Sequence, residues 1–119
     1  LQVDNFFSDH EVPENPMMVE GVLLEIQSKK KQLFRKVIVL RDRIVVMTSN
    51  KNANESGLPK VLKTIPLQYV LLEKDDDVPF SFRLFDTRVS GDGTLFTCSS
   101  EEELVLWLDT IFETIYSSQ

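Results

Sequence analysis

The sequence predicts a mainly β domain in which seven antiparallel strands form a curved sheet or partly open barrel, and one C-terminal helix at about residues 100–116 caps an opening. Two observations predict this class. Short apolar runs follow one another at hairpin spacing through residues 18–98, and no helical pattern interrupts them. After residue 99 the apolar period lengthens from two residues to between three and four. Consecutive strands on short connections favour an antiparallel meander over a parallel sheet.

The first three strands are predicted where aliphatic and β-branched residues cluster. They are expected at 18–26, 33–40 and 43–48. Residues 29–32 form the first connecting loop, and Arg41 and Asp42 form a tight turn between the second and third strands.

Four further strands follow a long polar loop at residues 49–59. They are expected at 60–67, 68–73, 80–85 and 94–98. In the run that begins at residue 80, Phe80, Phe82 and Leu84 alternate with polar residues, so these three side chains are expected to share one face.

The last segment carries the signature of an amphipathic helix. Ser100 is followed three residues later by Glu103, which is a capping-box pattern placed just before the apolar run. Trp107 lies near the middle of the helix, on its apolar side. The expected apolar face consists of Leu104, Leu108, Ile111, Phe112 and Ile115.

The composition describes one small globular domain. The chain has 119 residues, of which 42% are hydrophobic and 27% charged. No apolar run approaches the ~18 residues that a membrane span needs. The formal net charge of −6 argues against nucleic acid as a partner. Residues 28–43 are an exception to this net negative charge, because they hold seven basic side chains and one acidic side chain.

The sequence offers no framework for catalysis, a metal or a cofactor. His10 is the only histidine and lies in the expected linker, so a Ser-His-Asp arrangement would have no framework. Residues 75–77 are three aspartates, but they lack the spacing and the distal Glu of a calcium loop and read as a solvated acidic turn. Cys98 is the only cysteine, which fits a reducing, cytoplasmic compartment. Its thiol is either slightly activated by the nearby helix start or half-buried and inert.

The chain divides into two parts. Residues 1–17 are acidic, contain two prolines and are expected to be a linker or the end of a preceding domain, and residues 18–117 form the folded domain. The start at Leu1 rather than Met indicates a module from a longer protein, which is expected to be monomeric as a module. Phe6 and Phe7 are the exceptions in the linker, and they could either dock onto this domain or belong to the preceding one.

Three stretches in this order resemble the pleckstrin homology (PH) domain. They are "EGVLLEI" as the opening strand, "RKVIVLRDRIVVMT" as strands two and three, and "SSEEELVLWLDTI" as the closing helix. The resemblance covers about residues 18–117 and implies a seven-stranded sheet capped by a helix whose central Trp, here Trp107, packs into the sheet. No single stretch is specific, and the match rests on their order and spacing.

A narrower resemblance concerns the second and third strands. The run "VIVLRD" is similar to the corresponding strands of PH domains that follow Dbl-homology exchange domains, and among these to the PH module of giant obscurin-type muscle proteins. This resemblance implies an adjacent Dbl-homology domain, a Rho-family GTPase or a cytoskeletal protein as partner, and a cytoplasmic, cytoskeleton-associated location such as the sarcomere.

Lipid-binding members of the family carry basic residues on strands one and two that converge on headgroup phosphates. By resemblance, two of these positions are lost here, since Glu25 and Phe34 occupy them, and Lys36 keeps the third. A carboxylate ~4 Å from a phosphate costs roughly 4 kcal/mol at an effective dielectric constant near 20, before screening. Tight headgroup binding at the usual position is therefore not expected.

A weaker, nonspecific lipid contact remains open. Lys29, Lys30 and Lys31 lie at the tip of the first loop, and each exposed Lys near an anionic membrane contributes about 1 kcal/mol. Arg35 and Lys36 complete the candidate set, although adjacent strand residues point to opposite faces and cannot serve one pocket. The sequence leaves open which strand faces are buried.

The predicted function is a non-catalytic, regulatory protein-interaction module beside a Rho-family guanine nucleotide exchange domain, with at most weak phospholipid contact. The domain itself is not expected to be an enzyme, although the parent protein would carry exchange activity. The alternative function is a peripheral membrane-targeting domain that binds phosphoinositides through the basic stretch at residues 29–36.

Overall fold

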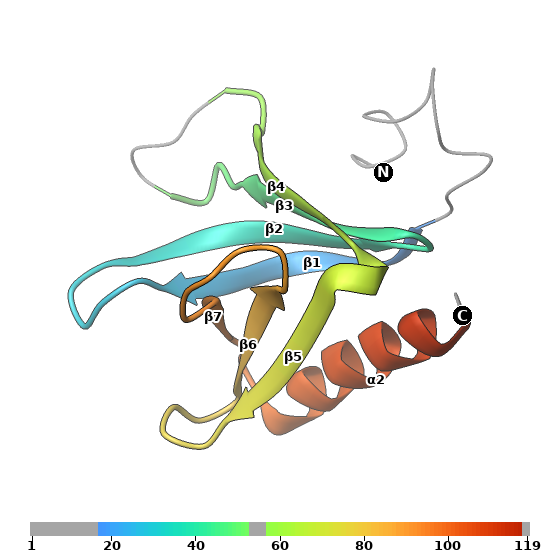
Figure 1. Cartoon of the computed structure of the whole chain (residues 1–119). Helices are drawn as coiled ribbons and strands as arrows, with labels where there is room; N and C mark the ends of the chain where they lie inside the picture. The colour runs from blue at the N-terminus through green and yellow to red at the C-terminus, as the bar shows by residue number, and fades with distance from the viewer. Residues whose placement is uncertain (1–16, 53–56, 118–119) are drawn as a thin grey trace.

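Seven strands and one long helix make up the fold of the computed structural model, which describes residues 17–52 and 57–117. The elements in chain order are β1 (Met17–Ile26), β2 (Gln32–Leu40), β3 (Arg43–Thr48), β4 (Val61–Pro66), the short 3₁₀-helix η1 (Leu67–Tyr69), β5 (Val70–Asp75), β6 (Ser81–Asp86), β7 (Thr94–Thr97) and α2 (Glu101–Ser117). The predicted fold class is confirmed, since a curled half-barrel of antiparallel strands is followed by one C-terminal helix (Figure 1).

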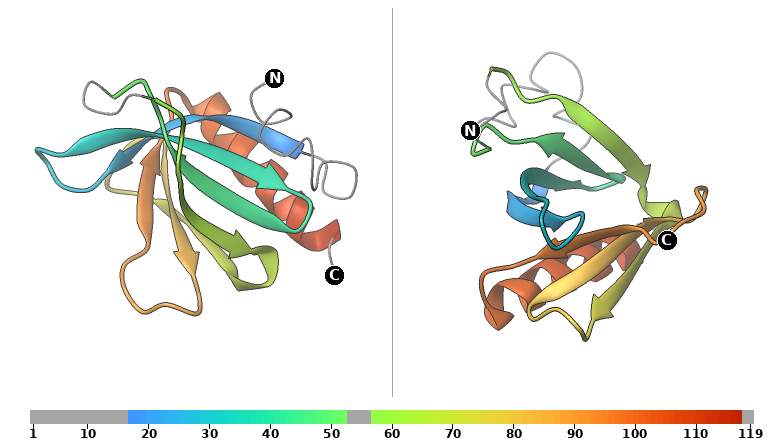
Figure 2. Two further views of the ribbon diagram at one scale, coloured as in Figure 1. Left: turned by 90° about the horizontal axis from the view of Figure 1, so that it is seen from above. Right: turned by 90° about the vertical axis from the view of Figure 1, so that its left-hand side faces the viewer.

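The strands form two meanders rather than one. Their order in the sheet is β4-β3-β2-β1-β7-β6-β5, and every neighbouring pair is antiparallel. Strands β1 to β4 therefore form one group and β5 to β7 the other, and the pairing of Leu24 with Thr97 and of Ile26 with Leu95 joins them. Leu67–Tyr69 turn the chain from the first group to the second at η1. Figure 2 shows the two groups facing each other, with α2 beside the second.

The main core lies between the two groups of strands and α2. Leu23 on β1, Phe82 on β6 and Phe96 on β7 are fully buried there, together with Leu104 and Trp107 on α2. The ring of Trp107 lies so close to β1 that a Cβ at Gly21 would sit 2.9 Å from its Cζ2 atom. Position 21 therefore has room only for glycine while the indole ring keeps this place.

The start of α2 is capped as the Ser100 and Glu103 spacing indicates, with one shift. The Ser100 Oγ accepts a hydrogen bond from the Glu103 backbone N–H at 3.2 Å. The Glu103 carboxylate returns to Ser99 instead of Ser100, accepting from its backbone N–H at 3.3 Å and from its hydroxyl at 3.0 Å. Both N-terminal serines thus help to satisfy the first turn of the helix.

Two expected side-chain placements are wrong. Phe80 does not share the face of Phe82 and Leu84, because it precedes β6 and adopts a left-handed φ of 58° that turns it out of the strand alternation. On α2, Phe112 is 43% exposed. The buried face of α2 runs along Leu104, Trp107, Ile111 and Thr114, and helical spacing places Phe112 to one side of it.

Candidate functional site

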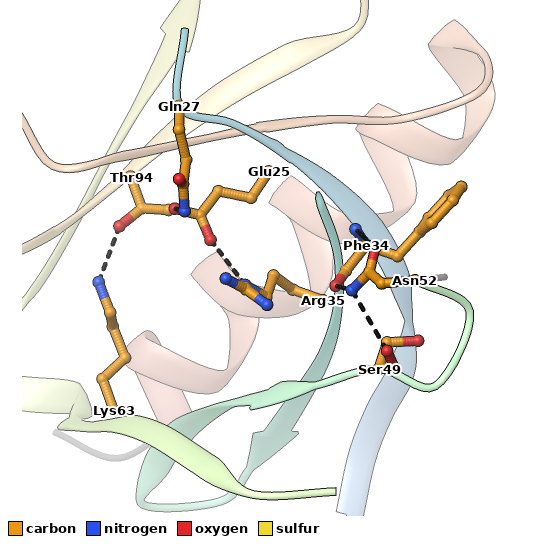
Figure 3. Close-up of polar contacts among 8 residues, drawn as sticks. All are labelled: Glu25, Gln27, Phe34, Arg35, Ser49, Asn52, Lys63 and Thr94. Carbon is orange, nitrogen blue, oxygen red and sulfur yellow. Dashed lines mark hydrogen bonds and ion pairs between the residues drawn. The ribbon is translucent and has the colours of Figure 1, made fainter. Parts of the chain in front are cut away.

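Four polar side chains meet in a mouth at the end of the sheet from which the turn at residues 27–31 projects. They are Glu25 near the end of β1, Arg35 near the start of β2, Lys63 on β4 and Thr94 at the start of β7 (Figure 3). The side chains come from four strands, so only the closed fold brings them together. We refer to this group as the polar mouth.

An ion pair occupies the β1–β2 side of the polar mouth. The Arg35 Nε donates to Glu25 Oε1 at 2.9 Å, and both side chains are largely shielded from water. The second carboxylate oxygen of Glu25 accepts from Gln27 Nε2 at 3.2 Å. The contact follows from the register, because Leu23 lies opposite Arg35 and Glu25 lies two residues further along the same face. An anion entering here would meet a carboxylate that already neutralises the guanidinium.

The other side of the polar mouth is bridged by a lysine. The Lys63 Nζ donates to the Thr94 hydroxyl oxygen at 2.8 Å, across strands that are not neighbours in the sheet. Beside this bridge lies a shallow hollow of about 300 Å³ between β4, β6 and the loop before β7. Asp86 also lines it, so the hollow contains both charge signs.

The end of β3 is fixed to β2 next to the polar mouth. The Asn52 side chain accepts from the Phe34 backbone N–H at 2.8 Å and donates to the Phe34 carbonyl at 2.9 Å. The same amide donates to the Ser49 carbonyl at 3.2 Å, and the Lys51 Nζ lies 5.6 Å from the centre of the Phe34 ring. One asparagine thereby replaces a pair of sheet hydrogen bonds and holds the rim in place.

The structure separates the residues that the sequence grouped as phosphate ligands. Glu25 and Arg35 point into the polar mouth, whereas Phe34 and Lys36 lie on the opposite face of β2. Lys36 forms an ion pair there with Glu20 of β1, at 3.4 Å from Nζ to Oε2. Arg35 is thus the strand-two cation on the face of Glu25, and Lys36 has no access to the same pocket.

The three loop lysines are exposed at the tip of the β1–β2 turn. Lys29, Lys30 and Lys31 all face solvent, and the hydroxyl oxygen of Ser28 accepts from the backbone N–H groups of Lys30 and Lys31. Nearby lies an open hollow of about 510 Å³, between this turn and the loop before β7. Glu25, Lys29, Arg83 and Asp92 contribute its charges, so the hollow is not a uniformly positive surface.

Sequence reasoning did not single out Lys63, Thr94 or Asn52. Each makes its contact with a residue 18 or more positions away in the chain. The only sequence signal was their polar character near predicted strand ends. Side chains of this kind become recognisable only when the pairing of the strands is known.

Cys98 is a free cysteine that is buried in the fold. Burial, with a smaller contribution from the charge of Glu103, raises the pKa of the Cys98 thiol to about 12. This supports the prediction that the thiol is half-buried and inert.

Asp75 lies at the start of the acidic turn, and its carboxylate accepts from the backbone N–H groups of Asp77 and Val78. The bond from Val78 is the largest cause that lowers the pKa of this carboxyl. In the described ranges no group of three His, Cys, Asp or Glu residues could hold a metal ion.

A half-barrel of two strand meanders, a C-terminal helix and a polar mouth between the loops define the class of small β modules to which PH domains belong. The family model described as "PH domain" matches residues 17–116. The chain therefore belongs to the PH domain family. No helix in the described part of the chain is long and apolar enough to cross a membrane.

Solved structures with a similar fold include several tandem DH/PH proteins. The DH/PH domain of human ARHGEF11, in a ternary complex with human RhoA and its inhibitor, has a TM-score of 0.72 and 20% sequence identity, covering 94% of this chain and 32% of that chain. The PDZ-RhoGEF DH/PH domains in complex with RhoA activated by GTP-γ-S have a TM-score of 0.74 and 16% identity, covering 100% and 34%.

The structure of a single PH domain is also similar. The N-terminal PH domain of human ARAP2 has a TM-score of 0.61 and 18% identity, covering 85% of this chain and 81% of that one. The present chain spans about a third of the length of the DH/PH chains. Among curated proteins, no sequence matches this chain. These structures are 20% identical to this chain or less, and they show that the PH fold is shared.

Proposed function

We propose that this PH domain is a non-catalytic regulatory module that follows a Dbl-homology exchange domain and acts mainly through protein contacts. The partners would be that exchange domain and a Rho-family GTPase, in a cytoplasmic and cytoskeleton-associated protein. A giant obscurin-type muscle protein is the parent that the pattern of the second and third strands favours. The DH/PH neighbours support this context, and two of them were crystallised with RhoA.

The observation that carries the proposal is the Glu25–Arg35 ion pair in the polar mouth. A phosphoinositide headgroup needs several cations that point at one phosphate cluster. Here Arg35 is neutralised by Glu25 at 2.9 Å, Lys63 is turned towards Thr94, and Lys36 lies on the other face. Loss of the headgroup site leaves protein contact as the function that such a module best supports.

The test is a nucleotide exchange assay in lipid-free solution. The parent protein would be compared with a form that lacks residues 17–117, and the release of labelled GDP from RhoA would be followed by fluorescence. We expect removal of the domain to change the exchange rate. A form with Lys29→Glu and Lys31→Glu is the control, and its rate should stay at the level of the intact protein. Unchanged rates without the domain, together with no bound GTPase, would contradict the proposal.

A second function is supported by the exposed turn at residues 29–31. Three lysines at one tip can give a weak, salt-dependent contact with anionic membranes. Sedimentation with vesicles that contain phosphatidylserine would measure it. Lys30→Glu should abolish sedimentation, whereas Arg41→Glu should retain it, because Arg41 is exposed at the opposite end of β2, roughly 30 Å away at ~3.3 Å per residue.

A further inference from the structure

The outer side of α2 carries a row of apolar side chains. Val105, Phe112 and Tyr116 are 45%, 43% and 75% exposed, and Leu108 is partly buried beside them. Their spacing of three, four and four residues places the four side chains in one row along the helix. Figures 1 and 2 show one side of α2 against the sheet, and no described element covers the side that is turned away from it. We refer to these four residues as the apolar stripe.

A row of carboxylates runs beside the apolar stripe. Glu102, Asp109 and Glu113 are exposed, and their spacing of seven and four residues places them next to the stripe on the helix surface. We refer to these three residues as the acidic row. The sequence of α2 contains no lysine, arginine or histidine. Lys74 of β5 lies near the first turn, but its ion pair is with Glu101, at 3.7 Å. Within the described ranges, no cation forms an ion pair with the acidic row.

The charge of this surface limits what can cover the apolar stripe. An anionic membrane would be repelled by the acidic row. A second copy packed α2 against α2 would place carboxylates opposite carboxylates, which opposes that pairing for the same reason. Residues 1–16, with Phe6 and Phe7, lie outside the described residues and play no part in this surface. A positively charged protein would gain from both the apolar contact and the ion pairs.

From the apolar stripe and the acidic row together, we infer that α2 docks a basic amphipathic helix of a partner protein. Val105 and Tyr116 are about 16 Å apart along the axis at ~1.5 Å per residue, which matches about three turns of a second helix. The partner helix would bury apolar side chains against Phe112 and Tyr116, and would place lysine or arginine opposite Asp109 and Glu113. This inference rests on the proposed role in protein contacts and gives that role a surface.

The test titrates two synthetic peptides into the ¹⁵N-labelled 119-residue chain. The first is an amphipathic helix of about 18 residues with leucines on one face and lysines beside them, which is long enough to be helical in water. The second has glutamate in place of every lysine. We expect the lysine peptide to shift the amide signals of α2 saturably, with an affinity that falls as salt is added. The glutamate peptide should leave these signals in place.

Two pairs of matched variants locate the contact. Phe112→Ser should weaken binding of the lysine peptide by about tenfold or more, because it removes an aromatic anchor. Leu106→Ser should leave the affinity unchanged, because Leu106 is 56% exposed on the same helix but lies beyond the acidic row. Asp109→Asn should weaken binding by about twofold to fivefold, which is typical of an exposed ion pair. Asp92→Asn, in the loop before β7, removes the same charge elsewhere and should have no effect.

Three results would overturn the inference. The first is that the lysine peptide leaves the α2 signals unshifted, or shifts them no more than the glutamate peptide does. The second is equal affinity in the Phe112→Ser and Leu106→Ser variants. The third is that the α2 signals shift when the chain alone is diluted, since a second copy would then be the occupant. The titration contains no exchange domain or GTPase. An exchange rate that depends on residues 17–117, without peptide binding, would therefore refute this surface and leave the proposed function standing.

Discussion

Glu25 and Arg35 come from neighbouring strands, and their side chains meet inside the polar mouth at 2.9 Å. Each is largely shielded, so removal of either partner leaves a charge in a poorly hydrated place. The carboxylate has a further role towards ligands. Its negative charge lies where an incoming phosphate would have to approach Arg35, and the repulsion opposes binding.

Glu25→Gln should therefore give the polar mouth affinity for a headgroup. The amide oxygen can still accept from Arg35, while the repulsive charge is gone. We expect binding of inositol trisphosphate to tighten by at least about tenfold, which corresponds to ~1.4 kcal/mol. Calorimetric titration measures it. Glu73→Gln, on the exposed part of β5, removes the same charge elsewhere and should have no such effect. Equal affinities in the two variants would show that the charge of Glu25 does not oppose phosphate binding in the polar mouth.

Gly21 offers a second test at the residue scale. In Gly21→Ala the new Cβ would lie 2.9 Å from Trp107 Cζ2, so the indole ring or β1 must shift. Overpacking of this kind costs about 1–3 kcal/mol in the free energy of unfolding, which urea denaturation measures. Trp107→Phe in the same chain should cost less in the Gly21→Ala background than in the unmodified one, because a smaller ring relieves the clash. Strictly additive effects would contradict the packing described here.

Cys98 should be unreactive in the folded protein. Its thiol has a pKa raised to about 12 by burial, so almost no thiolate exists at pH 8. Ellman's reagent should react slowly with the native chain and quickly in denaturant. Because folding favours the protonated thiol, its contribution to stability is complete below the ordinary pKa of 9.0 and is lost as the pH rises towards about 12. Rapid reaction under native conditions would exclude the buried state.

The C-terminal helix begins with a cap that involves Ser99, Ser100 and Glu103. It also carries three glutamates in its first turn, which is the favourable end of the helix dipole for negative charge. The Trp107 side of α2 closes the half-barrel. Stability of the helix start is thereby linked to stability of the whole core.

Ser100→Ala should destabilise the domain by ~1 kcal/mol, because the Glu103 backbone N–H loses its acceptor. The midpoint of urea denaturation should fall with no change in slope. Ser90→Ala, in the exposed loop before β7, is the matched control and should leave the midpoint unchanged. If both substitutions had equal effects, the cap would not be a stabilising contact.

How far the sequence could predict the elements depends on the range of the contacts that form them. Strand and helix positions followed from local apolar periods, and the helix predicted at about 100–116 is observed at Glu101–Ser117. The left-handed backbone at Phe80 and the outward position of Phe112 were missed. The first depends on backbone geometry, and the second on which part of the apolar side of α2 faces the core. In the polar mouth, the family resemblance singled out Glu25. Its contact with Arg35 could not be predicted without the register of β1 and β2.

At the scale of the whole molecule, the β1–β7 pairing gathers distant parts of the chain around one mouth. The sequence could not predict this connection, since pairing of strands far apart in the chain leaves no local pattern. The second property of the whole molecule is its charge. The net charge is −6, and three of the seven basic side chains in residues 28–43, those of Arg35, Lys36 and Arg43, form ion pairs. This charge distribution supports the proposal that the domain acts through protein contacts and not through a headgroup.

One measurement tests this account most directly. The ¹⁵N-labelled domain would be titrated in parallel with inositol trisphosphate and with the Dbl-homology domain of its parent protein, and amide chemical shifts would be followed. The account predicts saturable shifts with the exchange domain and none with the headgroup at Glu25 and Arg35. Saturable shifts at Glu25 and Arg35 with inositol trisphosphate, and none with the exchange domain, would contradict it.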